Sequence, residues 1–94
     1  MKTIKWLPEA REDLQRLHEF LSPYSQNAAT KAIHKLIAAV DSLKEFPEKG
    51  RPWDLEMNFR ELPVTFGARG YVIRYRITDN EVVIVRVWHA LENR

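Results

Sequence analysis

The chain contains no cysteine, and this absence excludes disulfide bonds and every chemistry that needs a thiolate. Its three histidines are scattered without a paired spacing, which argues against a zinc site. No stretch approaches the roughly 18 uninterrupted apolar residues of a membrane span, and the first residues lack the apolar core of a signal peptide. These absences predict a cytoplasmic protein with no metal, small-molecule cofactor or membrane partner, whose hydrophobic core stabilises the fold unaided.

The common signatures of enzymes are missing as well. The chain has no nucleophile elbow, phosphate-binding glycine loop, helical metal-binding histidine pair or calcium loop. The net charge is only +2 and no long basic block is present, so nonspecific coating of DNA is not favoured. The cations are unevenly distributed, because all six lysines lie in residues 1–50 whereas residues 51–94 contain seven arginines and no lysine. This arginine-only half indicates either a contact surface or a sheet covered by long side chains.

What the chain does contain predicts one folded domain over residues 1–94. Its content of 45% hydrophobic and 30% charged residues is typical of globular proteins. Residues 2–7 alternate as a short strand, and apolar residues over 7–21 then recur at steps of three and four, as on one face of a helix. After a break at 22–23, a second apolar stripe over 29–46 predicts a helix of about 20 residues. The short connection predicts that the two helices form an antiparallel hairpin.

The second half of the chain has the period of a sheet. Residues 46–52 combine two prolines and a glycine, which predicts a turn between the helical half and the strand half. Strands are predicted over residues 59–64, 71–77 and 82–88, with a hairpin turn at 78–81. The predicted fold class is therefore α/β, in the α+β sense. An N-terminal strand joins a three-stranded antiparallel run in one sheet, and the sheet packs on the helix hairpin.

The last hairpin leaves two registers open. A loop of two residues, Asp79-Asn80, sends Arg86 and Trp88 to the helix face of the sheet, whereas a three-residue loop sends them to the opposite face. We prefer the three-residue loop because it buries no arginine beneath the helices. This register predicts an exposed patch of apolar residues and arginines, which often marks an interface. The members of the predicted patch are Val72, Arg74, Arg76, Ile84, Arg86 and Trp88.

Four further side chains are candidates for specific roles. His89 directly follows Trp88 at the end of the last predicted strand, where side chains become reachable, and histidine titrates near neutrality. Its alternative role is capping or packing. Trp6 and Phe46 are predicted core anchors. Trp53 lies in the predicted loop as a lid over an edge of the core, and its alternative role is stacking on single-stranded nucleic acid.

Four segments resemble one protein family, and they occur in the family's order. They are residues 6–14 (WLPEAREDL), 43–52 (LKEFPEKGRP), 59–67 (FRELPVTFG) and 70–89, which includes GYVIRYRI and VVIVRVWH. Over nearly its whole length the chain resembles the RelE/ParE toxins of bacterial type II toxin–antitoxin pairs, and it is closer to the ParE branch. The resemblance implies a small α/β toxin that a cognate antitoxin neutralises by wrapping it with a disordered or helical segment.

The branches of this family differ in their targets. Members resembling RelE cut messenger RNA on the ribosome with basic residues on the sheet, and of those positions Arg60 keeps a cation here, whereas Leu62 and Val72 do not. Members resembling YoeB use a glutamate, an arginine and a terminal His-Tyr pair, of which only His89 matches. If the chain is a nuclease, the resemblance therefore implies His89 as the acid and Arg60 on the phosphate.

The resemblance favours the ParE branch, whose members poison DNA gyrase without an established catalytic residue. The expected partners are DNA gyrase and a cognate antitoxin, with Arg74, Arg76, Arg86 and Trp88 as candidate partner-binding residues. The antitoxin is expected to be acidic or amphipathic and to bind this sheet face or the groove along the helix hairpin. Two alternatives stay open. One is a RelE-like endonuclease acting with the ribosome and messenger RNA, and the other is a non-toxic module that only binds an antitoxin.

Overall fold

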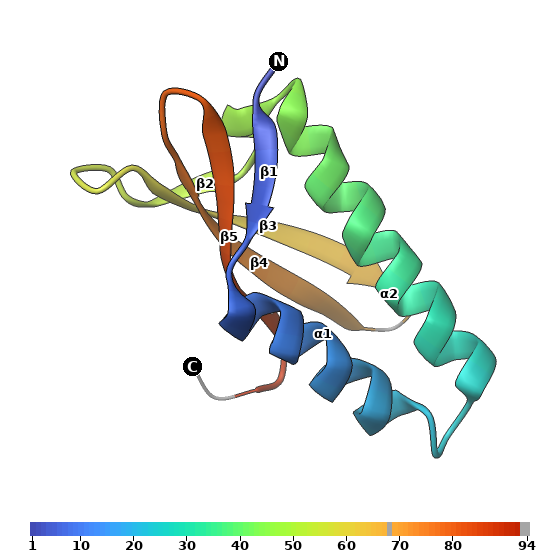
Figure 1. Ribbon diagram of the computed structural model, residues 1–94. Coiled ribbons are helices and arrows are strands. Elements are labelled where there is room, and N and C mark those ends of the chain that lie inside the picture. Colours follow the sequence, from blue (N-terminus) through green and yellow to red (C-terminus); the bar gives the residue numbers. More distant parts are fainter. Residues whose placement is uncertain (68, 93–94) are drawn as a thin grey trace.

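The computed structural model describes residues 1–67 and 69–92, which form a twisted sheet and a helix hairpin (Figure 1). Its strands and helices are β1 Thr3–Trp6, α1 Pro8–Leu21, α2 Gln26–Asp41, β2 Arg51–Asp54, β3 Phe59–Phe66, β4 Arg69–Ile77 and β5 Glu81–His89. The five strands form one sheet in the order β1-β5-β4-β3-β2. β1 runs parallel to β5 and the other pairs are antiparallel. The predicted α+β fold class, with the N-terminal strand in the same sheet, is confirmed.

Both helices begin at local start signals. α1 begins at Pro8, whose fixed φ suits the first helical turn. α2 begins after Ser25, whose hydroxyl accepts a hydrogen bond from the backbone N–H of Ala28 at 3.1 Å. The chain turns back between the helices, which lie side by side on one face of the sheet (Figure 1). This arrangement confirms the predicted hairpin.

The hydrophobic core lies between the helix hairpin and this inner face of the sheet. Tyr71, Ile73 and Tyr75 of β4 are buried there, as the alternation of this strand predicted. Trp6 is partly buried and packs against the same cluster, so its predicted role in the core is confirmed. The helices contribute the stripes predicted from their apolar spacing. Their buried core residues are Ala10, Leu17, Ala32, Leu36 and Val40.

Tyr75 connects the core to the segment that precedes β2. The backbone N–H of Gly50 donates to the Tyr75 hydroxyl at 2.8 Å, and this hydroxyl donates to the carbonyl of Pro47 at 2.7 Å. A Cβ at position 50 would lie 2.6 Å from the hydroxyl oxygen and 2.9 Å from the carbonyl oxygen of Glu61. Only glycine therefore fits between β3 and the tyrosine, and this contact sets where β2 begins.

The structure corrects three expectations about residues 41–54. α2 ends at Asp41 and continues only as a 3-10 turn over Ser42–Lys44, so it is shorter than predicted. Phe46 is 62% exposed and does not anchor the core, because the apolar stripe loses its period where the helix ends. Arg51–Asp54 forms β2, although its proline and its charges predicted a turn and a loop. Pro52 is tolerated because β2 is an edge strand that pairs only with β3.

The hairpin between β4 and β5 has the shorter of the two predicted loops. The N–H of Thr78 donates to the carbonyl of Glu81 at 2.9 Å, so only Asp79 and Asn80 lie in the loop. The preferred three-residue loop was therefore wrong at this end of the strand. As a consequence Ile84 faces the core and is fully buried.

A β-bulge in β5 restores the preferred register beyond Ile84. Ile84 pairs with Tyr75 whereas Arg86 pairs with Arg74, so Val85 is an extra residue in β5. The bulge turns Arg86 and Trp88 to the face away from the helices, here called the outer face. The prediction that no arginine of β5 lies beneath the helices is thus confirmed, but through a bulge and not through the loop.

Candidate partner-binding site

An arginine held between two tryptophans forms the centre of the outer face. The guanidinium carbon of Arg74 lies 3.6 Å from the ring centroid of Trp53 and 4.8 Å from that of Trp88. Its Nε and Nη2 both donate to one carboxylate oxygen of Glu61, at 3.0 and 2.8 Å. Glu61 is buried, so the ion pair is shielded from water. Trp53 therefore packs on an arginine of the outer face. The prediction that it forms a lid over an edge of the core was wrong.

The exposed apolar patch predicted for this face is not present in that form. Val72 and Trp88 are each only 7% exposed, and Ile84 lies in the core. Val72 and Trp88 do face outward as a cross-strand pair. The guanidinium carbons of Arg74 and Arg86 lie over the Trp88 ring, the latter at 5.1 Å from its centroid. The outer face consequently presents arginine side chains in place of bare apolar ones.

Asp13 of α1 ties together the helix, β5 and the segment after it. The backbone N–H of Val87 donates to Asp13 Oδ2 at 2.8 Å, and Arg86 Nε donates to the same oxygen at 2.7 Å. Arg16 Nη2 and Arg86 Nη2 each donate to Asp13 Oδ1 at 3.1 Å. Arg16 also forms an ion pair with Glu92. Arg86, predicted to bind a partner, is thus engaged within the chain.

Arg76 is the candidate arginine with the fewest internal ties among the described residues. Its side chain is exposed, and its Nε donates to the carbonyl of Met57 at 3.2 Å. In the structure Arg74 and Arg86 hold buried carboxylates, whereas the guanidinium of Arg76 contacts only a loop carbonyl. Of the predicted partner-binding arginines, Arg76 is therefore the one that can contact a partner without giving up an internal ion pair.

The two residues implied for nuclease chemistry lie far apart. Arg60 pairs with Tyr75 and His89 with Tyr71, on opposite sides of β4, which places their backbones about 16 Å apart. The guanidinium of Arg60 donates to the carbonyls of Glu48 and Gly50. These hydrogen bonds connect Arg60 of β3 to the segment that precedes β2. The fold does not bring His89 and Arg60 to one phosphate.

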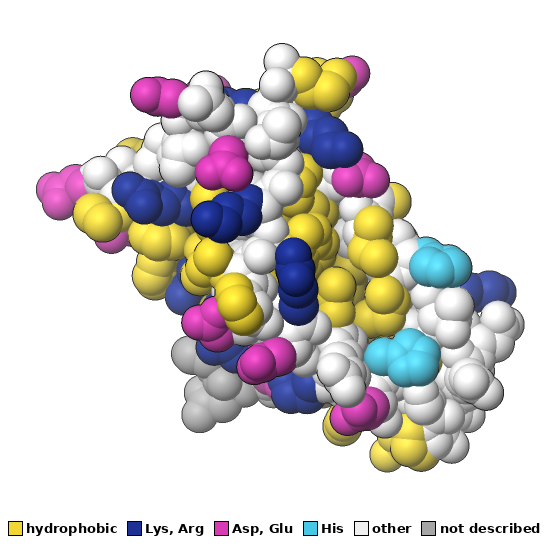
Figure 2. Space-filling view, viewed as in Figure 1, with side chains coloured by type: hydrophobic (Ala, Val, Ile, Leu, Met, Phe, Trp, Pro, Cys, Tyr) yellow, Lys and Arg dark blue, Asp and Glu magenta, His cyan; other side chains and the backbone are white. Residues whose placement is uncertain are grey.

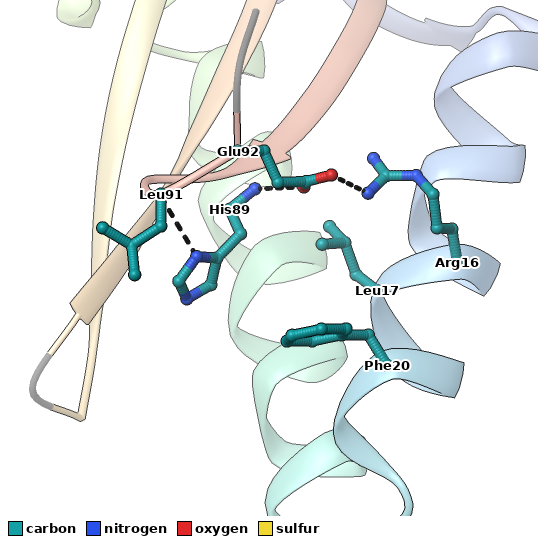
Figure 3. Close-up of a pocket in the computed structure, with 6 residues that line it drawn as sticks. All are labelled: Arg16, Leu17, Phe20, His89, Leu91 and Glu92. Atoms are coloured by element: carbon teal, nitrogen blue, oxygen red, sulfur yellow. Dashed lines mark hydrogen bonds and ion pairs between the residues drawn. The ribbon is translucent and has the colours of Figure 1, made fainter.

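His89 instead lines a pocket between α1 and the end of β5 (Figure 3). The pocket has a volume of about 520 Å³ and is mostly apolar. The Nδ1 of His89 accepts a hydrogen bond from the N–H of Leu91 at 3.1 Å, which leaves the proton on Nε2 in the neutral ring. Phe20 and Leu91 are largely exposed at the pocket. The ring of Tyr24 lies beside that of Phe20 in a tilted arrangement. The residues that line it are Arg16, Leu17, Phe20, His89, Leu91 and Glu92.

Within residues 1–67 and 69–92 no group of three or more His, Asp or Glu residues is placed to hold a metal ion. Over the same residues, no helix is both long and apolar enough to cross a membrane.

Comparison with protein families decides the class of the molecule. The sequence model described as the ParE toxin of type II toxin–antitoxin systems, parDE, matches residues 4–94. The chain belongs to the ParE toxin family. This confirms the resemblance found in the sequence and its assignment to the RelE/ParE toxins.

Curated relatives cover nearly all of the toxin. A protein named Toxin RelE3 from Caulobacter vibrioides is 39% identical over 94 residues, which is 100% of both chains. Toxin RelE1 from the same organism is 40% identical and covers 90% of this chain and 89% of its own. A relative from Sinorhizobium fredii, Putative toxin Y4kP, is 33% identical over 95% of this chain and 88% of its own. These names include the RelE label beside the ParE family match.

Solved structures share the fold of the toxin. A structure titled as the chromosomal ParDE TA system from P. aeruginosa superposes with a TM-score of 0.78 at 23% identity, over 95% of this chain and 96% of that one. The toxin–antitoxin complex RelBE2 from Mycobacterium tuberculosis superposes with a TM-score of 0.64 at 25% identity, over 94% and 96%. The two-layer arrangement of helix hairpin and sheet is therefore common to both branches.

The two carboxylates that pair with Arg16, those of Asp13 and Glu92, indicate that the fold is less stable at acidic pH. Burial alone raises the pKa of Asp13, but hydrogen bonds from Arg86, Val87 and Arg16 outweigh it and hold this pKa below its usual value. Burial likewise raises the pKa of Glu92, and its ion pair with Arg16 more than compensates, so this pKa is also lowered. Groups with lowered folded pKa values stabilise the fold above their unfolded pKa, near pH 4, and lose that contribution as pH falls.

We therefore expect the free energy of unfolding to fall as pH drops below about 4 to 5. Urea denaturation between pH 3 and 7 measures it. In Asp13→Asn the curve should be flatter over this range, because the residue at position 13 no longer titrates. An equally steep curve in that variant would place the titrating groups elsewhere.

Proposed function

We propose that this toxin poisons DNA gyrase by binding it and that a cognate antitoxin neutralises the toxin. The proposal starts from membership of the ParE family and from the sequence resemblance to the gyrase-poison branch. Its mode of action is binding and not catalysis. One stoichiometric contact with an essential enzyme suffices for toxicity, and no acid or base of the toxin is needed.

The placement of Arg60 and His89 carries this proposal. A nuclease needs a cation at the reacting phosphate and a proton donor or acceptor within hydrogen-bond reach of the same nucleotide. Here Arg60 is bound to backbone carbonyls near β2, and His89 lies at the other end of β4 beside Phe20 and Tyr71. This separation of the two residues that match the nuclease branches favours binding over cleavage as the mode of action.

A cognate antitoxin is proposed from the structural neighbours, one of which is titled a toxin–antitoxin complex. The pocket at His89, with the exposed side chains of Phe20, Tyr24 and Leu91, offers an apolar seat for an amphipathic segment. The outer-face arginines offer charge to an acidic one. Burying the apolar seat would stabilise the complex independently of salt, whereas a contribution from Arg76 would weaken as salt rises.

The second candidate is a RelE-like endonuclease that acts on messenger RNA at the ribosome. The observation in its favour is that three curated relatives from Caulobacter carry the name RelE. In this candidate His89 would act as the acid, with Arg60 replaced at the phosphate by a cation of another strand.

We expect induction of the toxin in growing bacteria to give filamentous cells with DNA damage, because a gyrase poison blocks chromosome maintenance and not translation. The purified full chain should inhibit supercoiling by gyrase and leave ribosome-bound message uncut in a toeprint assay. Loss of a general acid costs about 100-fold or more in rate. Codon-specific cuts that vanish in His89→Ala, with unaffected supercoiling, would contradict the gyrase proposal. Normal growth would identify a module that binds an antitoxin without toxicity.

A further inference from the structure

A second exposed apolar surface lies on the hairpin that joins β2 to β3. Trp53 and Met57 are each 51% exposed and Leu55 is 68% exposed, so every second residue from 53 to 57 presents a large apolar side chain. None of the three belongs to the hydrophobic core. The hairpin projects from the sheet at one end of the molecule (Figure 1), where apolar and acidic side chains are seen together (Figure 2). We call residues 53–58 the hairpin tip.

The tip is held in one conformation by its own hydrogen bonds. The side chain of Asp54 accepts from the N–H of Met57 at 3.2 Å, and the N–H of Asn58 donates to the carbonyl of Leu55 at 3.2 Å. Asn58 adopts a φ of 61°, the left-handed conformation that asparagine tolerates in turns. Its side-chain amide donates to the carbonyl of Ile77 at 3.0 Å. A preformed tip loses little conformational entropy on binding, which favours affinity.

The tip and the pocket at His89 are separate surfaces. The tip is bonded to Ile77, the last residue of β4, whereas His89 pairs with Tyr71 near the start of that strand. Six residues of extended strand span about 20 Å. A concave apolar pocket accepts a segment of another chain, and a projecting tip enters a cleft of a folded partner. The two surfaces can therefore serve two different partners.

The charge of the tip distinguishes between classes of partner. Asp54 and Glu56 are the charged side chains within residues 53–58, and Arg74 and Arg76 of β4 flank the tip at Trp53 and at the carbonyl of Met57. Nucleic-acid contacts depend on cations that neutralise phosphates, and two carboxylates at the contact would oppose them. An apolar cleft with basic residues at its rim fits both the apolar anchors and the carboxylates. Such a cleft belongs to a folded protein and not to an RNA groove.

We propose that the hairpin tip is the element by which the toxin contacts its target, inserting Leu55 and Met57 into an apolar, basic-rimmed cleft of a folded protein. The inference rests on the proposed function in that it takes gyrase as this protein. It assigns the antitoxin no part of the tip. Binding of target at the tip and binding of antitoxin at the pocket then involve different residues, which lie at opposite ends of β4.

The test compares two variants at exposed positions. Leu55→Ser combined with Met57→Ser removes both anchors, and Phe46→Ser removes an equally exposed apolar side chain outside the tip. Thermal unfolding confirms that each variant folds. With purified gyrase, the double variant should need at least about 10-fold more toxin for half-maximal inhibition of supercoiling, the loss of about one hot-spot residue. The Phe46 variant should match the unsubstituted chain. Equal inhibition by all three proteins would overturn the proposal.

A photo-crosslinking amino acid in place of Leu55 identifies the occupant of the tip. We expect a covalent adduct with a gyrase subunit, identified by mass spectrometry, and none from the same amino acid at position 46. An adduct with messenger or ribosomal RNA would overturn the tip as a protein contact, as would an adduct with an antitoxin alone or no adduct.

Growth assays separate failure of the tip from failure of the gyrase proposal. If the unsubstituted toxin arrests growth without inhibiting gyrase, the gyrase proposal fails. In that case the tip stands if the double variant no longer arrests growth and the adduct at position 55 is with another protein. It falls if the double variant still arrests growth.

Discussion

Replacing Asp13 with alanine is expected to lower the free energy of unfolding by about 2–4 kcal/mol, because it removes a buried carboxylate that accepts several hydrogen bonds, most of them from charged donors. Asp13 is 3% exposed and accepts four hydrogen bonds. Its loss leaves the guanidinium of Arg86 and that of Arg16 without their shared carboxylate. A loss of this size is a large part of the stability of a small domain.

The N–H of Val87 adds to this cost. β1 ends at Trp6 opposite Ile84, so beyond the bulge β5 has no neighbouring strand on that side. Asp13 takes the place of a strand partner by accepting from this N–H, which is buried. Without the carboxylate, a buried backbone donor is left unsatisfied, at about 1–3 kcal/mol. The bulge itself then loses the contact that stabilises it.

Urea denaturation at neutral pH measures the effect. Asp13→Asn keeps one acceptor oxygen for Val87 but not the charge, so its loss should be intermediate. Glu12→Ala removes an exposed carboxylate from the neighbouring position of α1 and should change stability by less than about 0.5 kcal/mol. A change below about 1 kcal/mol in Asp13→Ala would mean that the ion pairs and Val87 find water in its place.

The sequence does indicate that Asp13 is buried, but an analysis of the apolar residues alone does not detect it. It lies three residues after Ala10 and four before Leu17, so it shares the buried stripe of α1. A carboxylate at such a position requires a buried cation or donors. Two of its partners, however, Arg86 and Val87, lie more than seventy residues further along the chain, and nothing local identifies them.

The fold was predictable where one local pattern decides it. The alternation of β4 and the stripes of the two helices were sufficient for the core, because strand and helix periods place side chains directly. β2 was not predictable, because four residues with a proline form a strand only when β3 offers an edge. The bulge at Val85 was not predictable either, because its stability depends on Asp13 from α1.

The sequence left two interpretations open for the arginines of residues 51–94, a contact surface or a cover for the sheet, and the structure has arginines of both kinds. Arg74 and Arg86 hold the carboxylates Glu61 and Asp13, and Arg60 holds two carbonyls, so these three are structural. Each uses the planar fork of arginine, which a lysine does not have. Arg76 is exposed and is one arginine of the outer face that can serve a contact surface. Among these four arginines, three serve internal hydrogen bonds and one is available for a contact surface.

Arg74→Glu is expected to destabilise the toxin by at least about 3 kcal/mol, because it replaces the cation of a buried ion pair with a second carboxylate. Glu61 would then face a like charge inside a shielded site. The substitution also removes the group that lies between the Trp53 and Trp88 rings, and each cation–π contact contributes about 0.5–2 kcal/mol. Arg74→Lys keeps the charge but not the fork, and its loss should be smaller. Thermal and urea unfolding of the three proteins measure these differences.

Arg76→Glu separates folding from binding on the same strand. Arg76 is exposed and makes one hydrogen bond to a loop carbonyl, so its reversal should cost less than about 1 kcal/mol of stability. Weaker binding of an acidic antitoxin segment to this variant then reports a lost contact and not a lost fold, and the difference should shrink as salt is raised. Weaker binding to Arg74→Glu reports mainly unfolding. If the two reversals lower the unfolding midpoint equally, the stack of Arg74 between the tryptophans does not stabilise the sheet, and the prediction of a structural role for Arg74 is wrong.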